Sequence, residues 1–273
     1  MSKNLTKFAV SMDKEIRNDS KYPLGVALSG GGARGVAHAG ALKALEEAGL
    51  KPDIISGVSA GSVVAVLYAA GASPDAIKEM FRGVNFSDFT KLALGTGGLF
   101  SMEPFRRYIS RALRRFSRIE DLPMPTYIGA TNFDEGRPEV FTSGNLSMCV
   151  AASCSIPIVF PPVVINGVRY VDGGVLRNLP AWMIREKCHR LIGINVSPAG
   201  KADRLANNIV ANAIRAYTLL AKSNVVHDKE LCDILVQTDS LVHHKVFDLK
   251  DINSIFKSGY LAMKAELDKH KLI

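Results

Sequence analysis

The segment Leu24–Gly35, with the sequence LGVALSGGGARG, decides the fold of this 273-residue chain. Its first five residues are apolar or small, as in a buried strand, and they run directly into a loop that contains four glycines. Residues Val36–Ala48 then have the periodicity of a helix, and Gly49 is the expected helix stop. A buried strand that enters a glycine loop and a helix is typical of the first unit of an alternating α/β fold.

The same alternation of apolar runs and helix-period segments continues to the end of the chain. Asn166-Gly167 separates two β-rich runs and predicts a two-residue hairpin. We therefore expect an α/β fold, a three-layer α/β/α sandwich around a mainly parallel central sheet. The further strands expected are Ile54–Ile55, Tyr127–Thr131, Leu191–Val196 and Ile234–Gln237, and the further helices are Ala60–Ala70, one opened by Ser73-Pro74-Asp75, Leu205–Lys229 and Ile252–Lys271.

Length and composition favour one domain. Hydrophobic residues make up 47% of the chain and charged residues 22%, as in an ordinary globular protein, so we expect a polar extension over residues 1–22 and a single domain over 23–273. The longest apolar stretch, Gly57–Ala72, falls short of the ~20 residues that a membrane-spanning helix needs. The first 22 residues lack the apolar run of a secretory signal, and the four cysteines form no CxxC pair. We expect a cytoplasmic protein with free thiols, no metal and no cofactor.

The net charge of +8 favours an anionic partner. No nucleic-acid-binding motif accompanies this charge, so an anionic membrane surface, such as the inner face of a cell membrane, is the better candidate. Residues 105–118 predict a basic amphipathic helix, preceded by a flexible joint at Gly95–Gly98. Such a helix lies on a membrane or, more commonly, packs on the core with a solvated arginine face. Its apolar side comprises Phe105, Tyr108, Ile109, Ala112, Leu113 and Phe116, and its basic side comprises Arg106, Arg107, Arg111, Arg114, Arg115 and Arg118.

A candidate nucleophile lies between an expected strand and an expected helix. Residues Gly57–Gly61 read Gly-Val-Ser-Ala-Gly, the pattern of a nucleophile elbow with Ser59 at its tip. In such an elbow Gly57 and Gly61 let the strand and helix approach closely, and the helix N-terminus favours negative charge beside the serine. The alternative is a small-residue turn at which a helix packs tightly on the sheet.

The glycine loop Gly30–Gly35 also follows a strand and precedes a helix, so its backbone N–H groups can converge on an anion. Two functions fit this arrangement: an oxyanion hole or a cradle for a dinucleotide phosphate. The second needs an acidic residue at the carboxyl end of the next strand. Asp53 has about the right spacing, but it precedes Ile54 and therefore lies at the wrong end, so the oxyanion hole is favoured.

The serine needs a base, and none of the six histidines lies in a glycine-rich turn after a strand. Asp172-Gly173-Gly174 does occupy such a turn, directly after the expected strand Val168–Val171. A carboxylate can accept the serine proton if burial raises its pKa and a hydrogen bond aligns it. The alternative is a surface turn with a solvated aspartate.

These three motifs, in this order, resemble those of the patatin-like phospholipase family over residues 23–200. Two further segments, Ser153–Pro157 and Phe160–Pro162, resemble the family sequence just before the aspartate motif. The resemblance implies Ser59 as nucleophile and Asp172 as base, with Gly173 and Gly174 completing the base motif. The oxyanion hole would be the loop Gly30, Gly31, Gly32, Ala33, Arg34 and Gly35, with N–H donors at Gly31, Gly32 and Ala33 or Arg34.

The resemblance further implies hydrolysis of acyl esters, of lipids or lysophospholipids, through an acyl-serine intermediate without metal or cofactor. Arg34 would either hold the glycine loop by side-chain bonds to carbonyls or face water at the start of the helix. Two alternatives stay open: a catalytically silent regulatory protein on the same fold, and a dinucleotide-binding protein that uses Gly30, Gly32 and Gly35. The sequence leaves the acyl acceptor, chain length, headgroup and oligomeric state undetermined.

Overall fold

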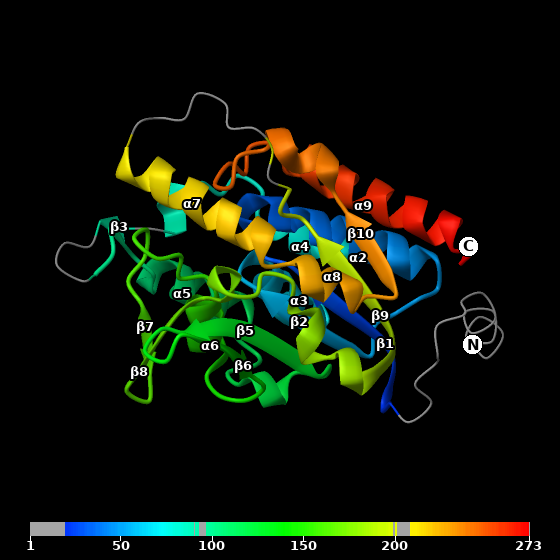
Figure 1. The fold of residues 1–273 in the computed structure, drawn as a ribbon, viewed down its shortest axis with the longest axis horizontal. Coiled ribbons are helices and arrows are strands. Elements are labelled where there is room, and N and C mark those ends of the chain that lie inside the picture. The colour runs from blue at the N-terminus through cyan, green and yellow to red at the C-terminus, as the bar shows by residue number, and fades with distance from the viewer. Residues whose placement is uncertain (1–19, 90, 93–96, 199, 201–207, 273) are drawn as a thin grey trace.

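A computed structural model describes residues 20–89, 91–92, 97–198, 200 and 208–272. In these ranges eight strands form one sheet in the order β10-β9-β1-β2-β5-β8-β7, with β6 also paired to β5 (Figure 1). The strands are β1 (Tyr22–Leu28), β2 (Ile54–Val58), β5 (Thr126–Asn132), β6 (Arg137–Phe141), β7 (Val163–Ile165), β8 (Val168–Asp172), β9 (Cys188–Asn195) and β10 (Ile234–Gln237). A separate two-stranded sheet pairs β3 (Lys91–Leu92) with β4 (Phe100–Ser101).

The sheet is mainly parallel, as predicted. Strands β10, β9, β1, β2 and β5 run parallel to their neighbours, whereas β6 and β8 run antiparallel to β5. Strands β7 and β8 form the predicted hairpin, and both of its turn residues, Asn166 and Gly167, have positive φ as a type I′ turn requires.

One edge of β5 is shared between two strands. Val58 at the end of β2 pairs with Gly129, and the next residue of β5, Ala130, pairs with Asp172 at the end of β8. Strand β6 occupies the opposite edge, where it pairs with the same two residues of β5. The register therefore brings Asp172 next to the point where the chain leaves β2 at Ser59.

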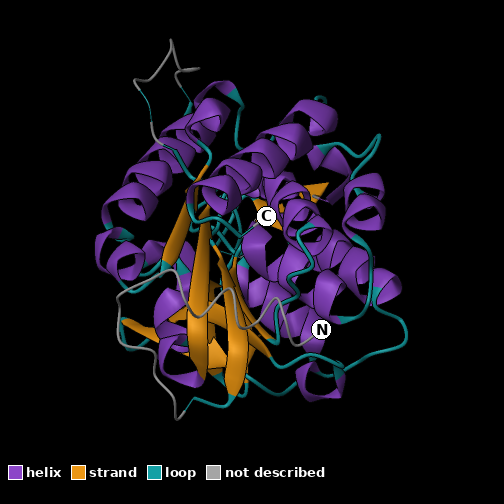
Figure 2. Ribbon diagram, turned by 90° about the vertical axis from the view of Figure 1, so that its right-hand side faces the viewer, coloured by secondary structure: helices purple, strands orange, loops and turns teal. Residues whose placement is uncertain are grey.

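Helices cover both faces of the sheet, which confirms the three-layer α/β/α sandwich (Figure 2). Side chains alternate along β1: Val26 and Leu28 pack in one core cluster, and Ala27 packs in another on the opposite face. The first cluster is covered by α2 (Val36–Glu47), α3 (Ala60–Ala69), α4 (Pro74–Met80), α5 (Glu103–Ala112), α6 (Leu146–Ser153) and α9 (Ile252–Lys269). The second is covered by short turns, Pro180–Met183 and Arg185–Lys187, and by α8 (Val226–Glu230).

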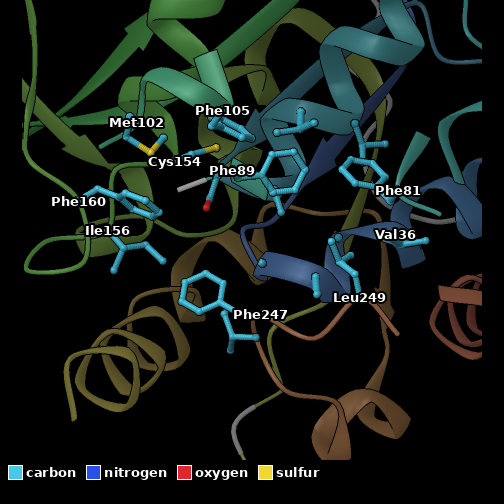
Figure 3. Close-up of a pocket in the computed structure, with 18 residues that line it drawn as sticks. Val36, Phe81, Phe89, Met102, Phe105, Cys154, Ile156, Phe160, Phe247 and Leu249 are labelled. Carbon is cyan, nitrogen blue, oxygen red and sulfur yellow. The ribbon is translucent and has the colours of Figure 1, made fainter. Parts of the chain in front are cut away.

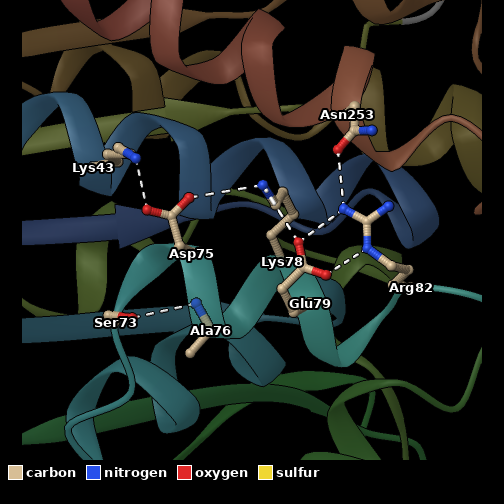
Figure 4. Close-up of polar contacts among 8 residues, drawn as sticks. All are labelled: Lys43, Ser73, Asp75, Ala76, Lys78, Glu79, Arg82 and Asn253. Carbon is tan, nitrogen blue, oxygen red and sulfur yellow. Dashed lines mark hydrogen bonds and ion pairs between the residues drawn. The ribbon is translucent and has the colours of Figure 1, made fainter.

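Polar contacts tie the short helix α4 to α2 and α9 (Figure 4). Ser73 caps α4 as predicted, because its hydroxyl accepts a hydrogen bond from the N–H of Ala76 (3.2 Å). Asp75 pairs with Lys43 of α2 (2.6 Å), and Arg82 donates to Asn253 of α9 (3.3 Å). These contacts join α4 and the residues just after it to the two neighbouring helices.

The expected helix 205–229 is wrong as a single element. The structure has α7 (Ile209–Ser223) and then α8, separated at Asn224 and Val225, while residues 201–207 lie outside the described ranges. The side chain of Asn224 donates to the carbonyl of Gly174 (2.9 Å) and accepts from the N–H of Asn178 (2.9 Å). The break between the helices thus supplies a side chain that holds the segment after Asp172.

The basic helix predicted over 105–118 is also too long, because α5 ends at Ala112. Leu113 is buried like a helical core residue, but it belongs to a turn, and Arg118 instead forms a bridge with Asn145. The apolar side packs inward, with Ile109 fully buried. Of the expected joint Gly95–Gly98, only Gly97 and Gly98 lie within the described residues.

The expected extension 1–22 lies almost entirely outside the described residues, so the division into an extension and one domain stays a prediction. Among the helices described here, none combines the length and the apolar character needed to cross a membrane.

Candidate active site

Ser59 directly follows β2, at the position where the sequence predicts the tip of a nucleophile elbow. Its φ of 52° and ψ of −127° place it in a strained turn between β2 and α3. A Cβ at Gly57 would lie 2.5 Å from the carbonyl oxygen of Gly61, and one at Gly61 would collide with the carbonyl oxygen of Leu28. Both glycines are therefore required by the close approach of backbone segments at the elbow.

Ser153, the last residue of α6, links the backbone of Ser59 to strand β5. The N–H of Ser59 donates to the hydroxyl of Ser153 (2.8 Å), and that hydroxyl donates to the carbonyl of Gly129 in β5 (2.6 Å). The carbonyl of Ser59 accepts a bond from the hydroxyl of Ser62 (2.6 Å). Both polar backbone groups of Ser59 therefore have hydrogen-bond partners, and Ser59 also lines an apolar pocket.

Asp172, the last residue of β8, is completely buried beside this elbow. Its Oδ1 accepts hydrogen bonds from the N–H of Gly174 (2.8 Å) and from the hydroxyl of Tyr217 (2.9 Å). Its Oδ2 is buried and, among the described residues, has no hydrogen bond of normal geometry. Burial raises the pKa of Asp172 to about 6, although the Ser59 hydroxyl, the Gly174 N–H and the Tyr217 hydroxyl each favour the charged form.

Some N–H groups of the glycine loop already have hydrogen-bond acceptors within the protein, and others do not. Gly30 donates to the carbonyl of Asn178 (3.1 Å) and Ala33 donates to that of Val246 (2.7 Å), so neither N–H is available to an oxyanion. In the described part of the chain, the N–H groups of Gly31 and Gly32 have no acceptor, and the same holds for Ala60 at the start of α3. The expectation that Ala33 supplies a donor is therefore wrong.

The glycine loop lies against Ser59 and Ala60. A Cβ at Gly35 would be 2.6 Å from the Cβ of Ala60, and one at Gly30 would be 3.1 Å from the Cβ of Ser59. Gly32 has a φ of 59°, and a Cβ there would collide with the carbonyl of Val246. These contacts explain why glycine stands at three of the loop positions.

Arg34 is buried and does not face water. Its Nε donates to the carbonyl of His244 (2.8 Å) and its Nη1 donates to the carbonyl of Pro198 (2.9 Å). Burial lowers the pKa of its guanidinium from the usual value. The side chain of Arg34 therefore bonds to carbonyls, which agrees with the first of its two alternatives, and its role in holding the glycine loop stays a prediction.

The dinucleotide interpretation fails on position. The carboxylate of Asp53 accepts a hydrogen bond from the N–H of Leu24 (2.9 Å), near the start of β1 and just before the start of β2. The glycine loop lies at the opposite, carboxyl end of β1. A ribose bound at that loop would therefore be out of reach of this acid.

None of the side chains that line the pocket is a histidine. His38 is the most deeply buried of the six, and its Nε2 donates to the carbonyl of Ser29 (2.8 Å) behind the glycine loop. Burial lowers the pKa of His38 to about 4, so the ring is neutral at neutral pH and acts as a support for the loop. The buried carboxylate of Asp172 is therefore the titratable group that faces the Ser59 hydroxyl among the described residues considered for the base.

Sequence reasoning missed three residues of the site: Ser153, Asn178 and Tyr217. Asn178 is fully buried, and besides its carbonyl bond to Gly30 its side chain donates to the carbonyl of the same glycine (3.4 Å). Tyr217 reaches Asp172 from α7, 45 residues further along the chain. Two signals were available: Ser153 begins the segment Ser153–Pro157 that resembles the family sequence, and Tyr217 lies between Ala213 and Ala221 on the buried side of a helix.

An apolar pocket opens beside Ser59 (Figure 3). It has about 800 Å³ of empty space, including its open mouth. Residues from six separate parts of the chain form its walls. Figure 3 shows aromatic rings on opposite sides of it. Besides Ser59 and the glycine loop, the lining includes Val36, Ala60, Val63, Val64, Phe81, Phe89, Met102, Phe105, Cys154, Ile156, Phe160, Val246, Phe247 and Leu249.

An elbow serine, a buried carboxylate and unbonded N–H groups at the carboxyl edge of a mainly parallel sheet are features of the class of α/β acyl hydrolases. A sequence profile of the family described as patatin-like phospholipase matches residues 26–184, and the chain belongs to this family.

Several lysophospholipases contain a segment similar to this chain. Lysophospholipase nte1 of Aspergillus fumigatus is 36% identical over 169 residues, which are 57% of this chain and 11% of that protein. Lysophospholipase NTE1 of Kluyveromyces lactis is 34% identical over 213 residues, 70% of this chain and 14% of that protein. The chain therefore spans only a small part of the length of these curated relatives. The crystal structure of VipD from Legionella pneumophila matches with a TM-score of 0.57 and 17% identity, covering 92% of this chain and 67% of that one, and this likeness concerns the fold.

Proposed function

We propose that this protein hydrolyses acyl esters of lipids, with lysophospholipids as the favoured class, through an acyl-Ser59 intermediate. The observation that carries the proposal is the convergence of Ser59, Asp172 and the unbonded N–H groups of Gly31 and Gly32 beside a pocket with apolar walls. The names of the similar lysophospholipases agree with a single-chain lipid as substrate.

In the first half of the reaction, Oδ2 of Asp172 takes the proton from the Ser59 hydroxyl as its oxygen attacks the ester carbonyl. The negative charge that develops on the carbonyl oxygen is held by the N–H groups of Gly31 and Gly32, and by that of Ala60 at the positive end of α3. The ester C–O bond then breaks, and Asp172 gives its proton to the departing alcohol.

In the second half, a water molecule gives its proton to Asp172 and attacks the acyl-serine. Collapse of the second tetrahedral intermediate breaks the bond to the Ser59 oxygen, which recovers the proton from Asp172, and the free fatty acid leaves. A base whose pKa is about 6 is charged at neutral pH and still holds a proton well enough to serve as the acid in each half.

The apolar pocket is the proposed site of the acyl chain, and Leu249 tests this assignment. Leu249→Trp should narrow the pocket and lower kcat/KM for a palmitoyl ester by about tenfold or more, because each methylene kept out of an apolar site forfeits roughly 0.8 kcal/mol of burial. Hydrolysis of a butyryl ester should change little. A series of esters that differ only in acyl length measures the effect.

Leu261→Trp is the matched control, because Leu261 lies on α9, is 51% exposed and does not line the pocket. If Leu249→Trp lowers kcat/KM equally for the palmitoyl and butyryl esters, the acyl chain binds elsewhere. The same conclusion follows if the control changes the preference between the two esters as much as Leu249→Trp does.

The basic surface of α5 and the turn after it is proposed to contact anionic lipid, as a peripheral interaction of a cytoplasmic protein with the inner membrane surface. Arg106 and Arg107 both pair with Glu103, and Arg118 pairs with Glu120. Three arginines remain exposed without an ion pair in the described part of the chain, and these are Arg111, Arg114 and Arg115.

Replacing these three arginines by glutamine should weaken binding to anionic vesicles at low salt and leave the hydrolysis of short soluble esters unchanged. Each basic residue at such a surface contributes ~1 kcal/mol, and added salt screens the attraction. Sedimentation with vesicles measures binding. Lys257, Lys264 and Lys271, exposed on or just after α9, give a control with the same change in charge when replaced by glutamine. Equal losses in the two triple variants, or no vesicle binding by the wild type, would contradict the proposal.

A further inference from the structure

Tyr217 lies outside the three glycine motifs and directly contacts the carboxylate of the proposed base. It lies on α7, is buried, and donates from its hydroxyl to Oδ1 of Asp172 (2.9 Å). We propose that Tyr217 is a positioning residue for the base: its hydroxyl fixes Oδ1 and thereby turns Oδ2 towards the Ser59 hydroxyl. This inference rests on the proposed function, since it assigns the way in which that site is held ready for reaction.

The two carboxylate oxygens of Asp172 differ in the hydrogen-bond donors that they receive. Oδ1 receives two hydrogen bonds, from the N–H of Gly174 and from Tyr217, whereas Oδ2 has none from the described residues. Two donors on one oxygen limit rotation of the carboxylate about its χ2 torsion, which is otherwise broad. The lone pairs of Oδ2 are then the ones free to receive a proton from Ser59.

Gly174 leaves the space that the Tyr217 hydroxyl occupies. A Cβ at this position would collide with the hydroxyl oxygen of Tyr217 and lie 2.7 Å from Oδ1 of Asn178. The space beside the base is therefore occupied by the tyrosine hydroxyl, and glycine is the residue that leaves room for it. Gly174 and Tyr217 thus pack against each other, and both donate to Oδ1 of Asp172.

The ring and the hydroxyl of Tyr217 have separable roles. The ring packs in an apolar cluster with Met102, Ile156 and Phe160, which also line the pocket. Replacement by phenylalanine keeps that packing and removes only the donor to Asp172. The consequences of losing the hydrogen bond can therefore be measured with the pocket wall in place.

The pH dependence follows from the groups that face Asp172. These are the Ser59 hydroxyl at the elbow, the Gly174 N–H, the Tyr217 hydroxyl on α7 and the thiol of Cys154 after α6. Burial raises the pKa values of both Cys154 and Tyr217 above their usual ranges, so the thiol stays neutral and the phenol remains a donor at every working pH. The Tyr217 hydroxyl favours the charged carboxylate, so its loss should raise the pKa of Asp172.

The test compares kcat and KM across pH for the wild type and Tyr217→Phe on a short soluble ester. We expect kcat at neutral pH to fall about tenfold to a hundredfold with little change in KM. We also expect the acid limb of the profile to move to higher pH by about one unit. Tyr68→Phe is the control, because Tyr68 is also buried and donates to a carboxylate, Oε1 of Glu46 (2.7 Å), without lining the pocket. Its acid limb should coincide with that of the wild type.

An acid limb in Tyr217→Phe that coincides with the wild type would overturn the inference, however low the activity, because a structural role alone does not change the titration of the base. If Tyr217→Phe does not fold, Gly174→Ala gives the second measurement: it displaces the hydroxyl and should move the acid limb in the same direction, and an unmoved limb counts against the inference. Failure of the proposed function is a separate result, namely a wild type that neither hydrolyses esters nor is labelled at Ser59.

Discussion

Ser59→Ala is expected to abolish the hydrolysis of short and long acyl esters, with a loss of at least about a thousandfold in kcat. The substitution removes the oxygen that attacks the ester. The backbone that the elbow imposes on this position is retained, because the N–H bond to Ser153 and the carbonyl bond from Ser62 do not involve the lost hydroxyl. The variant should therefore fold and keep the melting temperature of the wild type within a few degrees. An ester assay with purified protein measures the loss.

Ser56→Ala is the matched control for this prediction. Ser56 is a fully buried serine in β2, its hydroxyl donates to the carbonyl of Pro180 (2.9 Å), and it does not line the pocket. The control should retain activity. A folded Ser59→Ala protein that hydrolyses esters at the wild-type rate would refute the assignment of the nucleophile.

Asp172→Asn should lower kcat by several orders of magnitude, since an amide cannot accept the proton of Ser59. Replacement of any one of the six histidines by glutamine should lower kcat far less than Asp172→Asn does. A histidine variant that folds and is as inactive as Asp172→Asn would indicate a triad that this account lacks. Rates measured on the same ester for all seven variants decide the point.

The same substitution should change stability in a pH-dependent way. Burial raises the pKa of Asp172 to about 6 in the folded protein, above its ordinary value of 3.8. Its contribution to folding is therefore complete below about pH 4 and is lost as the pH rises through about 6. Asparagine does not titrate, so the stability of the variant relative to the wild type should be greater at pH 8 than at pH 4 by roughly 2–3 kcal/mol. Denaturant unfolding at the two pH values measures this difference.

The sequence predicts well what depends on local backbone constraints. Gly57 and Gly61 signal the elbow because backbone segments meet there without room for a Cβ, and Asn166-Gly167 signals the hairpin because both residues adopt positive φ. Asp172 could be singled out because it ends a strand and precedes two glycines. These features are determined within a few residues of chain.

The features that sequence reasoning missed depend on contacts between distant segments. The N–H of Ala33 cannot donate to an oxyanion, because it already donates to the carbonyl of Val246, more than 200 residues further along the chain. Tyr217 approaches Asp172 through the packing of α7, which no local pattern specifies. The end of α5 was misplaced because Leu113 is buried in a turn as effectively as it would be in a helix, so apolar spacing alone does not mark the boundary.

The assignment of Ser59 as a nucleophile activated by Asp172 can be tested directly in the intact protein. Intact-protein mass spectrometry after treatment with a fluorophosphonate probe, followed by peptide mapping, tests it without any assumption about the substrate. We expect a single adduct on Ser59, formed faster as the pH rises through about 6, where the buried carboxylate becomes charged. No adduct on the folded protein, or an adduct confined to another residue, would contradict it.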